Sequence, residues 1–366
     1  MSEGLPLREE VPVRETWDLK DLFTSDQAFY QTLEQVVQMS LDFNHTYYQK
    51  LNNIETIEKA LDEYERILIE IDRLYNYPEL RLSVDTANEE AQKVNAKLNT
   101  TSGKLAGLLS FVDSEILELS DDKISELRSR TKYPHFIKQL QDRKPYQLSA
   151  DVEKVLATLT PTLRSPFELY GTTKSLDINF ESFDYEGVTY PLDYATFENE
   201  YEDHPSPEFR RKSFRAFSDA LRQYQHTTAA TYNMQVQQEK IEADLRGYDS
   251  VIDYLLQDQE VTKDMFDRQI DVIMSDLAPV MQKYAKIIQR VHNLDKMRFE
   301  DLKISIDPNF EPEISIEKSK KYIYGALNVL GDDYVKMLES AYDYRWIDFA
   351  QNKGCLLYTS PSPRDS

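Results

Sequence analysis

The fold is decided by a stretch that begins PEFRR (residues 207–211), pauses at RGYDS (246–250) and ends VHNLDKMRF (291–299). The apolar residues of its second half recur at alternating spacings of four and three, which places them on one face of an α-helix. A β-strand would divide the same residues between its two faces. We therefore expect long packed helices, the second with an apolar face made by Phe266, Ile270, Ile273, Leu277, Val280, Tyr284, Ile287 and Val291.

Local features refine this expectation. The apolar pattern continues through Pro279, which favours one kinked helix over two separate helices. Gly247 is suited to end the preceding helix in the left-handed conformation. A basic cluster lies at the start of the first helix, where positive charge opposes the helix dipole, so we expect acidic partners for its members. This cluster consists of Arg210, Arg211, Lys212 and Arg215.

Helical patterns also dominate the N-terminal half. Residues 54–75 keep one apolar face, and we expect Pro78 to end that helix. A second apolar pattern over residues 84–112 predicts a partner helix, and the short link predicts an antiparallel helical hairpin. An intermolecular coiled coil is the alternative, although Tyr64 and Thr101 at seam positions fit a mixed globular core better.

One region predicts β-structure. Ile178–Phe180 and Val188–Tyr190 are β-type runs on either side of DYEG (residues 184–187), which has the composition of a hairpin turn. A short helix is expected to follow from Asp193.

Charge and composition exclude several classes of protein. The chain has 43 basic and 65 acidic residues and a formal net charge of −22, which argues against nucleic-acid binding through a basic surface. No run approaches the ~18 consecutive apolar residues of a membrane helix, and residues 1–10 lack a secretory signal pattern. The single cysteine, Cys355, excludes an internal disulfide and a cysteine-based metal site. We therefore expect a cytoplasmic protein with no membrane or nucleic-acid partner.

An ordered series of short segments resembles oligoendopeptidase F, of the thimet-oligopeptidase-like zinc metallopeptidases. No single segment is decisive, and the order carries the resemblance over about residues 11–354. The segments are RETWDL (14–19), the basic-aromatic start at 209–217, RGYDS (246–250), VT (261–262), FEDL (299–302), RWID (345–348) and NKG (352–354). The resemblance implies a mainly α fold, with long antiparallel helices like those of thimet oligopeptidase and neurolysin and one small β-hairpin beside the substrate cleft.

The resemblance also implies a domain organisation. Residues 1–25 are expected to be an extended N-terminal segment, and residues 26–200 an N-terminal helical domain with the hairpin near 175–192. Residues 201–354 would form the first part of an incomplete catalytic domain. Residues 355–366 depart from the family in composition and are interpreted as a foreign or artefactual tail.

The zinc signature of the family is not in the sequence. That signature, His-Glu-x-x-His, places two histidines four residues apart on one helix face to bind one Zn²⁺. The closest two histidines here are 22 positions apart, and the five are His45, His135, His204, His226 and His292. Nucleophile-elbow and phosphate-loop motifs are also missing. We therefore expect no catalytic, cofactor-binding or metal-binding residue in this chain. His204 is expected to be an exposed loop residue, and His226 and His292 to make local hydrogen bonds.

Two hypotheses follow. The first is a fragment of a zinc-dependent oligoendopeptidase, truncated before the His-Glu-x-x-His helix and inactive alone. Zinc and short peptide substrates would then belong to the full-length family. The alternative is a non-catalytic helical scaffold or partner-binding protein. The first hypothesis predicts exposed apolar side chains around residues 266–291, whereas the second predicts a self-contained chain.

Overall fold

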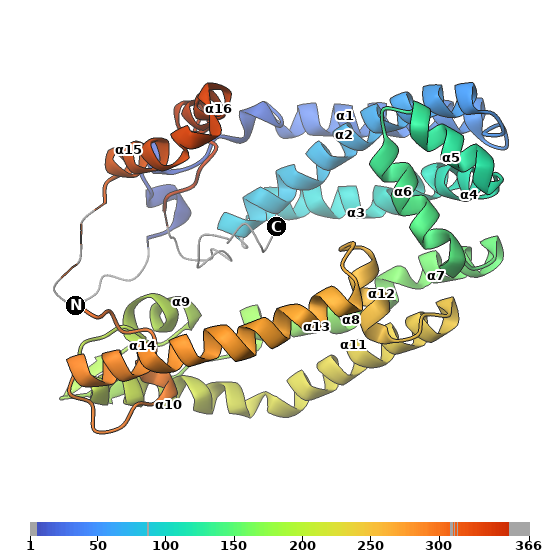
Figure 1. Cartoon of the computed structure of the whole chain (residues 1–366). Helices are drawn as coiled ribbons and strands as arrows, with labels where there is room; N and C mark the ends of the chain where they lie inside the picture. Colours follow the sequence, from blue (N-terminus) through green and yellow to red (C-terminus); the bar gives the residue numbers. More distant parts are fainter. Residues whose placement is uncertain (1–5, 86–87, 308–309, 311, 313, 351–366) are drawn as a thin grey trace. The chain divides into compact units, whose positions relative to one another are not determined.

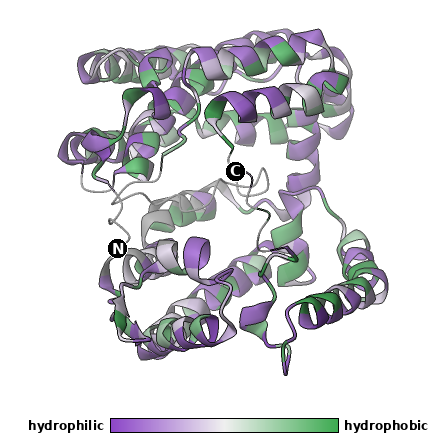
Figure 2. Ribbon diagram, turned by 90° about the vertical axis from the view of Figure 1, so that its left-hand side faces the viewer, coloured by the Kyte–Doolittle hydropathy of each residue, from purple (hydrophilic) through white to green (hydrophobic). Residues whose placement is uncertain are grey.

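The computed structural model describes residues 6–85, 88–307, 310, 312 and 314–350. It is mainly helical, with one two-stranded antiparallel sheet, as the sequence predicts (Figure 1). Hydrophobic and hydrophilic residues are interspersed along the helices, as expected of amphipathic helices (Figure 2). None of the described helices is long and apolar enough to cross a membrane. The predicted foreign tail, residues 355–366, lies outside the described residues.

The chain divides into two compact units. The first unit contains residues 1–142 and 312–366, and the second contains residues 143–311.

The first unit is built on three long helices that pack against one another. These are α1 (Asp26–Tyr47), α2 (Ile54–Val84) and α3 (Glu89–Leu109). Each begins behind a side chain that accepts a hydrogen bond from the backbone of the first turn, namely Ser25, Asn53 and Asn88. One continuous apolar core lies between them and includes the fully buried Phe29, Ile57, Leu74, Leu98, Ile124 and Ile137.

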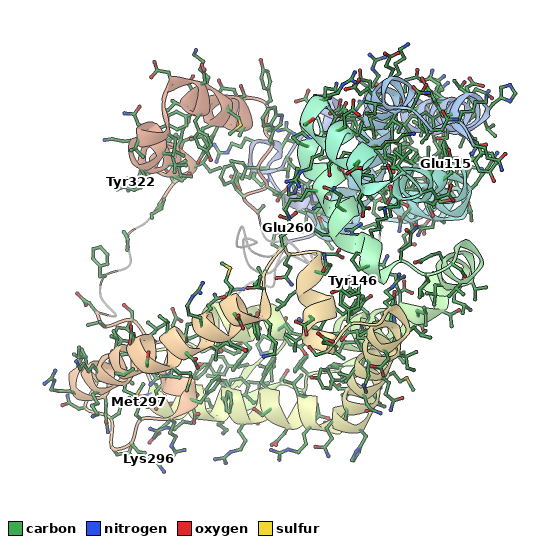
Figure 3. All side chains as sticks on the ribbon, turned by 45° about the vertical axis from the view of Figure 1, so that its right-hand side comes forward. Glu115, Tyr146, Glu260, Lys296, Met297 and Tyr322 are labelled. Atoms are coloured by element: carbon green, nitrogen blue, oxygen red, sulfur yellow. The ribbon has the colours of Figure 1, made fainter. Side chains whose placement is uncertain are left out.

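Shorter elements complete this unit. They are η1 (Arg8–Glu10), η2 (Val13–Glu15), η3 (Leu19–Asp21), α4 (Phe111–Leu117), α5 (Asp121–Arg130), α6 (Pro134–Arg143), α15 (Ile316–Leu327), η9 (Asn328–Leu330) and α16 (Asp332–Asp343). Glu115 of α4, labelled in Figure 3, accepts hydrogen bonds from the backbone N–H groups of Gln49 and Leu51 and so fixes the link between α1 and α2.

The prediction that Pro78 ends its helix is wrong. Pro78 is buried inside α2, which continues to Val84. A proline inside a helix removes one hydrogen bond, and burial of Leu74, Tyr77 and Val84 on the same helix stabilises it enough to continue. Val84 therefore closes α2 instead of opening the next helix. The predicted pairing of these two helices is confirmed, because α2 and α3 pack together.

The N-terminal segment, around residues 15–18, is hydrogen-bonded to residues 345–349. Backbone hydrogen bonds run from Asp18 N–H to the Arg345 carbonyl (2.7 Å) and from Phe349 N–H to the Glu15 carbonyl (2.8 Å). The segment predicted as extended therefore contains short 3₁₀ turns and is anchored. Side chains add to this connection: Arg8 pairs with Asp348, Arg345 donates to the carbonyls of Thr16 and Trp17, and Trp346 Nε1 donates to Asp21.

The second unit is a series of helices interrupted by the hairpin. Its elements before the hairpin are η4 (Lys144–Tyr146), α7 (Ala150–Leu163), α8 (Ser165–Thr172) and the π-helical η5 (Thr173–Asp177). The hairpin consists of β1 (Phe183–Tyr185) and β2 (Val188–Tyr190). The remaining elements are α9 (Tyr194–Thr196), η6 (Phe197–Tyr201), α10 (Pro207–Gln223), α11 (Gln225–Arg246), α12 (Val251–Gln257), α13 (Lys263–Val272), η7 (Ile273–Leu277), α14 (Ala278–Val291) and η8 (Phe299–Asp301).

The hairpin is shorter and shifted relative to the prediction. Glu186 and Gly187 both have positive φ, 50° and 81°, so they form a two-residue turn that pairs Tyr185 with Val188. This turn requires the first strand to end at Tyr185, and Ile178–Phe180 is not a strand. Phe180 instead stacks on Phe217 of α10, with 5.0 Å between ring centroids.

The long helical stretches largely follow the sequence. The stretch before Gly247 divides at Tyr224 into α10 and α11, and Gly247 ends α11 with φ 79°, as predicted. The second stretch is helical from Lys263 to Val291 without a break (orange in Figure 1), which confirms the prediction of one helix through Pro279. The π-helical η7 lies directly before this proline and accommodates the missing N–H donor.

Shortening a buried side chain of α2 tests how far the apolar core stabilises the first unit. We expect Leu74→Ala to lower the free energy of unfolding by about 2–5 kcal/mol, because Leu74 is fully buried and the substitution leaves a cavity. Ile69 of the same helix is 53% exposed, so Ile69→Ala is the matched control and should cost less than about 1 kcal/mol. Urea denaturation followed by circular dichroism measures both, and equal losses would contradict the packing described.

Candidate functional site

The candidate site lies in the second unit, where the hairpin packs against the start of α10. Phe209, only 1% exposed, is at its centre. Both strands supply rings that meet Phe209 edge to face, and His204 stacks on it at 3.9 Å. The edge-to-face partners are Phe183 (5.4 Å), Tyr185 (5.2 Å), Tyr190 (4.9 Å) and Tyr201 (5.2 Å). Such ring pairs add specific attraction to the burial of area, so the hairpin is held rigidly on the helix.

A second aromatic group extends this contact two turns along α10. Phe217 stacks on Phe180 and on Phe197, with centroid distances of 5.0 and 4.1 Å, and Tyr194 meets its edge at 5.1 Å. Phe209 and Phe217 are eight residues apart and therefore lie on one face of α10. The aromatic residues between positions 180 and 201 pack against that face.

The neighbouring face of α10 is fixed by a buried ion pair. Arg210 and Asp301 are 1% and 0% exposed, and Arg210 Nη2 lies 2.7 Å from Asp301 Oδ1. Arg210 also donates to the carbonyls of His204 and Pro205 through Nη1. Arg211 Nη2 reaches Asp295 at 3.1 Å and Asp301 at 3.5 Å. The expected acidic partners are thus found for two of the four basic residues of the cluster.

Asp301 connects the start of α10 to the residues around η8. Its Oδ2 accepts the backbone N–H of Arg298 at 3.2 Å, so one carboxylate joins α10 to η8. Two charges removed from water stabilise a structure only when geometry and additional hydrogen bonds compensate for the lost hydration. Here the carboxylate contacts two guanidinium groups and one amide, which compensates for its own lost hydration, whereas the buried Nε atoms of Arg210 and Arg211 have no hydrogen-bond partner among the described residues.

Comparison with known proteins gives the family. Residues 115–180 match the family model described as Oligopeptidase F, and residues 201–354 match Peptidase family M3, so that together the two ranges take in more than half of the chain. The chain belongs to peptidase family M3.

Relatives of this M3 chain are named as oligopeptidases. Oligopeptidase PepF of Bacillus subtilis is 26% identical over 96% of this chain and 53% of the relative. An oligoendopeptidase F homolog of Lactococcus lactis is 23% identical over 95% of this chain and 58% of the relative. The chain therefore spans about half the length of the curated relatives it matches.

Solved structures share the fold. Oligoendopeptidase-F from Enterococcus faecium superposes with a TM-score of 0.66 at 22% identity, over 86% of this chain and 61% of that one. PZ peptidase A with an inhibitor gives a TM-score of 0.60 at 13% identity, over 92% and 55% of the two chains.

The M3 family implies zinc, and the residues described do not fit a zinc ion. Among them, no three His, Cys, Asp or Glu side chains are grouped so that they could hold a metal. The histidines lie apart: His45 is in α1, His135 in α6, His204 in the loop before α10, His226 in α11 and His292 at the end of α14.

The histidines of the second unit make hydrogen bonds with other residues of that unit. His292 Nε2 lies 2.7 Å from the Ser305 carbonyl, and the ring of His226 contacts the side chain of Gln225, in agreement with the prediction for both. His204 differs from its prediction, because it is half-buried instead of exposed. Its Nδ1 accepts the N–H of Ser206 at 3.1 Å.

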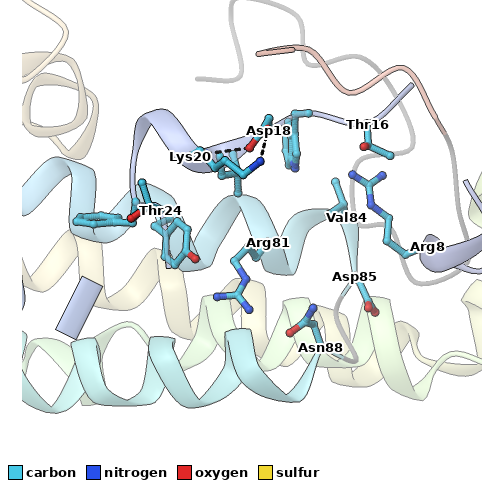
Figure 4. A pocket seen from close by; sticks show the side chains of 13 residues that line it. Arg8, Thr16, Asp18, Lys20, Thr24, Arg81, Val84, Asp85 and Asn88 are labelled. Atoms are coloured by element: carbon cyan, nitrogen blue, oxygen red, sulfur yellow. Dashed lines mark hydrogen bonds and ion pairs between the residues drawn. The ribbon is translucent and has the colours of Figure 1, made fainter. Parts of the chain in front are cut away.

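Two concave regions of the first unit were not predicted. One has a volume of about 360 Å³ and is lined by residues that include Trp17, Tyr77 and Arg81 (Figure 4). Its charged groups are paired, since Arg81 contacts Asp26 and Lys20 contacts Asp18. The other, of about 390 Å³, is lined by residues that include Asn53, Lys123 and Glu126. Neither groups the nucleophile, base and oxyanion donors of a hydrolytic site.

The buried carboxylate gives the second prediction. We expect Asp301→Ala to destabilise the chain by about 3–5 kcal/mol, because it leaves Arg210 charged and buried without its carboxylate. Asp295→Ala is the matched control: it removes the other partner of Arg211, but Asp295 is 75% exposed, and the cost should be below about 1 kcal/mol. Thermal unfolding and near-ultraviolet circular dichroism measure both, and similar behaviour of the two variants would refute the assigned role.

The environment of His204 gives the third prediction. Burial lowers the pKa of His204 below its ordinary value of about 6.5; the hydrogen bond with Ser206 opposes this shift, and the nearby Arg210 adds to it. The folded chain thus binds this proton less tightly than the unfolded chain, so its contribution to stability is present above pH 6.5 and is lost as pH falls through the folded pKa. Proton NMR of the imidazole, assigned with His204→Gln, should give a pKa below 6.5. A value at or above 6.5 would contradict the burial described.

Proposed function

We propose that this chain supplies part of a zinc-dependent oligoendopeptidase that hydrolyses internal bonds of short peptides. The observation that carries the proposal is the pair of family matches, to Oligopeptidase F over residues 115–180 and to Peptidase family M3 over residues 201–354. The names of relatives such as oligopeptidase PepF point to short peptides as the substrate class.

The chain's contribution is the wall of the substrate cleft. We assign residues 26–200 to the N-terminal helical domain and 201–354 to the first part of the catalytic domain, and the start of the M3 match at residue 201 supports this boundary. The hairpin, clamped on α10 by its aromatic rings, provides a rigid element of that wall. Short peptides, and not folded proteins, would enter a cleft enclosed by helices on several sides.

By itself the chain is proposed to be inactive. The sequence contains no His-Glu-x-x-His, and the residues described offer no grouped metal ligands. In the proposed enzyme zinc would supply Lewis-acid chemistry, and its ligands would come from residues outside this sequence. We also propose a cytoplasmic location without a nucleic-acid partner, supported by the net charge of −22 and the single cysteine.

The scaffold hypothesis is less well supported. A self-contained scaffold would cover its apolar surfaces, whereas Leu277, Val280 and Met281 are each about half exposed. This exposure is the outcome predicted for a peptidase fragment.

An activity assay tests the proposed function. The purified 366-residue chain is incubated with zinc and an internally quenched peptide, and its metal content is measured after desalting. We expect no cleavage above buffer and no stoichiometric zinc, while full-length PepF of Bacillus subtilis in the same assay serves as the positive control. One tightly bound zinc per chain, or cleavage abolished by a chelator, would overturn the proposal of inactivity.

A further inference from the structure

The first unit contains a cavity to which the proposed function gives no role. It has a volume of about 360 Å³ and lies between the N-terminal segment and the C-terminal part of α2. This volume is within the range of pockets that hold small molecules in proteins, roughly 300–1,000 Å³. The side chains of Arg81, from α2, and Asn88, at the start of α3, extend toward each other there (Figure 4).

Several hydrogen-bond donors that line the cavity have no partner among the described residues. The Arg81 guanidinium contacts Asp26 through Nη1, and its Nε and Nη2 make no further hydrogen bond there. Asn88 caps α3 with its Oδ1, which leaves its amide Nδ2 without a described acceptor. The indole Nε1 of Trp17 is in the same condition. A carboxylate suits such donors, because it accepts on two oxygens and matches the fork of a guanidinium.

Aromatic rings lie beside these donors. Trp17, Phe23 and Tyr77 line the cavity, and the Arg81 guanidinium lies over the Tyr77 ring, 5.1 Å from its centroid. This stacking orients the plane of the guanidinium and leaves its edge available for hydrogen bonds. The combination fits a carboxylate that is attached to a flat apolar side chain.

The charges around the cavity are nearly balanced, which limits the class of ligand. Three cations, Arg8, Lys20 and Arg81, and two carboxylates, Asp18 and Asp85, line it. Arg8 and Lys20 are already engaged in ion pairs. The chain as a whole carries a net charge of −22, so it repels polyanions. A zwitterion, with a carboxylate for Arg81 and an ammonium group near the acidic side chains, satisfies both conditions.

The wall formed by the N-terminal segment is fixed by hydrogen bonds to residues 345–348. Trp17 N–H donates to Asp348 at 3.1 Å, and Arg345 donates to the Trp17 carbonyl at 3.2 Å. The N–H of Asp18 donates to the Arg345 carbonyl. A wall that is already in place does not have to be ordered by the ligand, which lowers the free-energy cost of binding.

We propose that this cavity binds a free amino acid or dipeptide with an aromatic side chain, as its zwitterion. The carboxylate would contact Arg81 and Asn88, the aromatic ring would pack against Trp17 and Tyr77, and the ammonium group would face Asp18. A peptide hydrolase releases molecules of this class as products. The inference nevertheless does not depend on the proposed function, since it follows from the donors, rings and charges of the cavity.

Titration of the 366-residue chain with the dipeptide Gly-Phe tests the site. Trp17 is one of two tryptophans in the chain, so indole fluorescence reports a ligand that binds beside it. We expect a saturable change with a dissociation constant of about 1 mM or tighter. Glycyl-phenylalaninamide has the same side chain but no carboxylate, and it should bind at least about tenfold more weakly.

Arg81→Gln tests the protein side of the same contact. It removes the guanidinium and should weaken Gly-Phe at least about tenfold, while binding of the amide changes by less than about twofold. Arg73→Gln is the matched control. Arg73 lies on the same helix and over an aromatic ring, 5.0 Å from the centroid of Phe23, but it does not line the cavity. Gly-Phe should bind this variant as it binds the unaltered chain, and circular dichroism checks that both variants are folded.

Three results would each overturn the inference. They are no saturable change with Gly-Phe up to about 10 mM, equal affinity for Gly-Phe and its amide, and full binding by a folded Arg81→Gln variant. Acetate that competes as strongly as Gly-Phe would also contradict it, because the contact would then be an unselective one with any anion. No zinc and no cleavage are involved, so the result is independent of the activity assay that tests the proposed function.

Discussion

The second unit depends on the buried carboxylate of Asp301. It lies 91 residues from Arg210 in the sequence, so this ion pair closes the chain from the start of α10 to the residues after α14. The residues between them run from α10 to the end of α14, and a buried ion pair joins the two ends of this segment. The aromatic face of α10 then positions the hairpin, and the end of α14 is positioned through the adjacent pair of Arg211 and Asp295. Two carboxylates, Asp301 and Asp295, thus connect the helix that holds the hairpin to the end of the long helix.

The two units stabilise themselves by different means. The first has one large apolar core in which three long helices bury a face each, and burial of apolar area dominates its stability. The second has small separate clusters, an aromatic one around Phe209 and an aliphatic one around Ile288. Small clusters supply little hydrophobic stabilisation, which makes the ion pair and the ring contacts proportionally more important there. Two amphipathic helical runs of similar length show the contrast: α2 buries eight residues, whereas α13–α14 buries only Ile288.

Local sequence signals predicted much of the fold. Ser120 and Ser315 are local signals of this kind: each hydroxyl accepts an N–H three residues ahead, within one turn, and so begins a helix. Gly247 likewise ends α11 for a local reason. Pro78 was misjudged because tertiary packing outweighed a local penalty. The hairpin register was misjudged because DYEG does not reveal which two residues adopt positive φ. Asp301 could not be selected from 65 acidic residues, although the basic cluster at 210–215 correctly signalled that some carboxylate had to approach it.

The exposed apolar side chains of α13–α14 and the lack of grouped metal ligands among the described residues are related within the proposed function. A catalytic zinc site needs ligands held in fixed geometry by surrounding side chains and hydrogen bonds. Along α13–α14 the small clusters of the second unit provide little of such a frame, because Ile288 is the one residue of this run that is buried. The exposure of α13–α14 is thus in keeping with the lack of grouped metal ligands among the described residues.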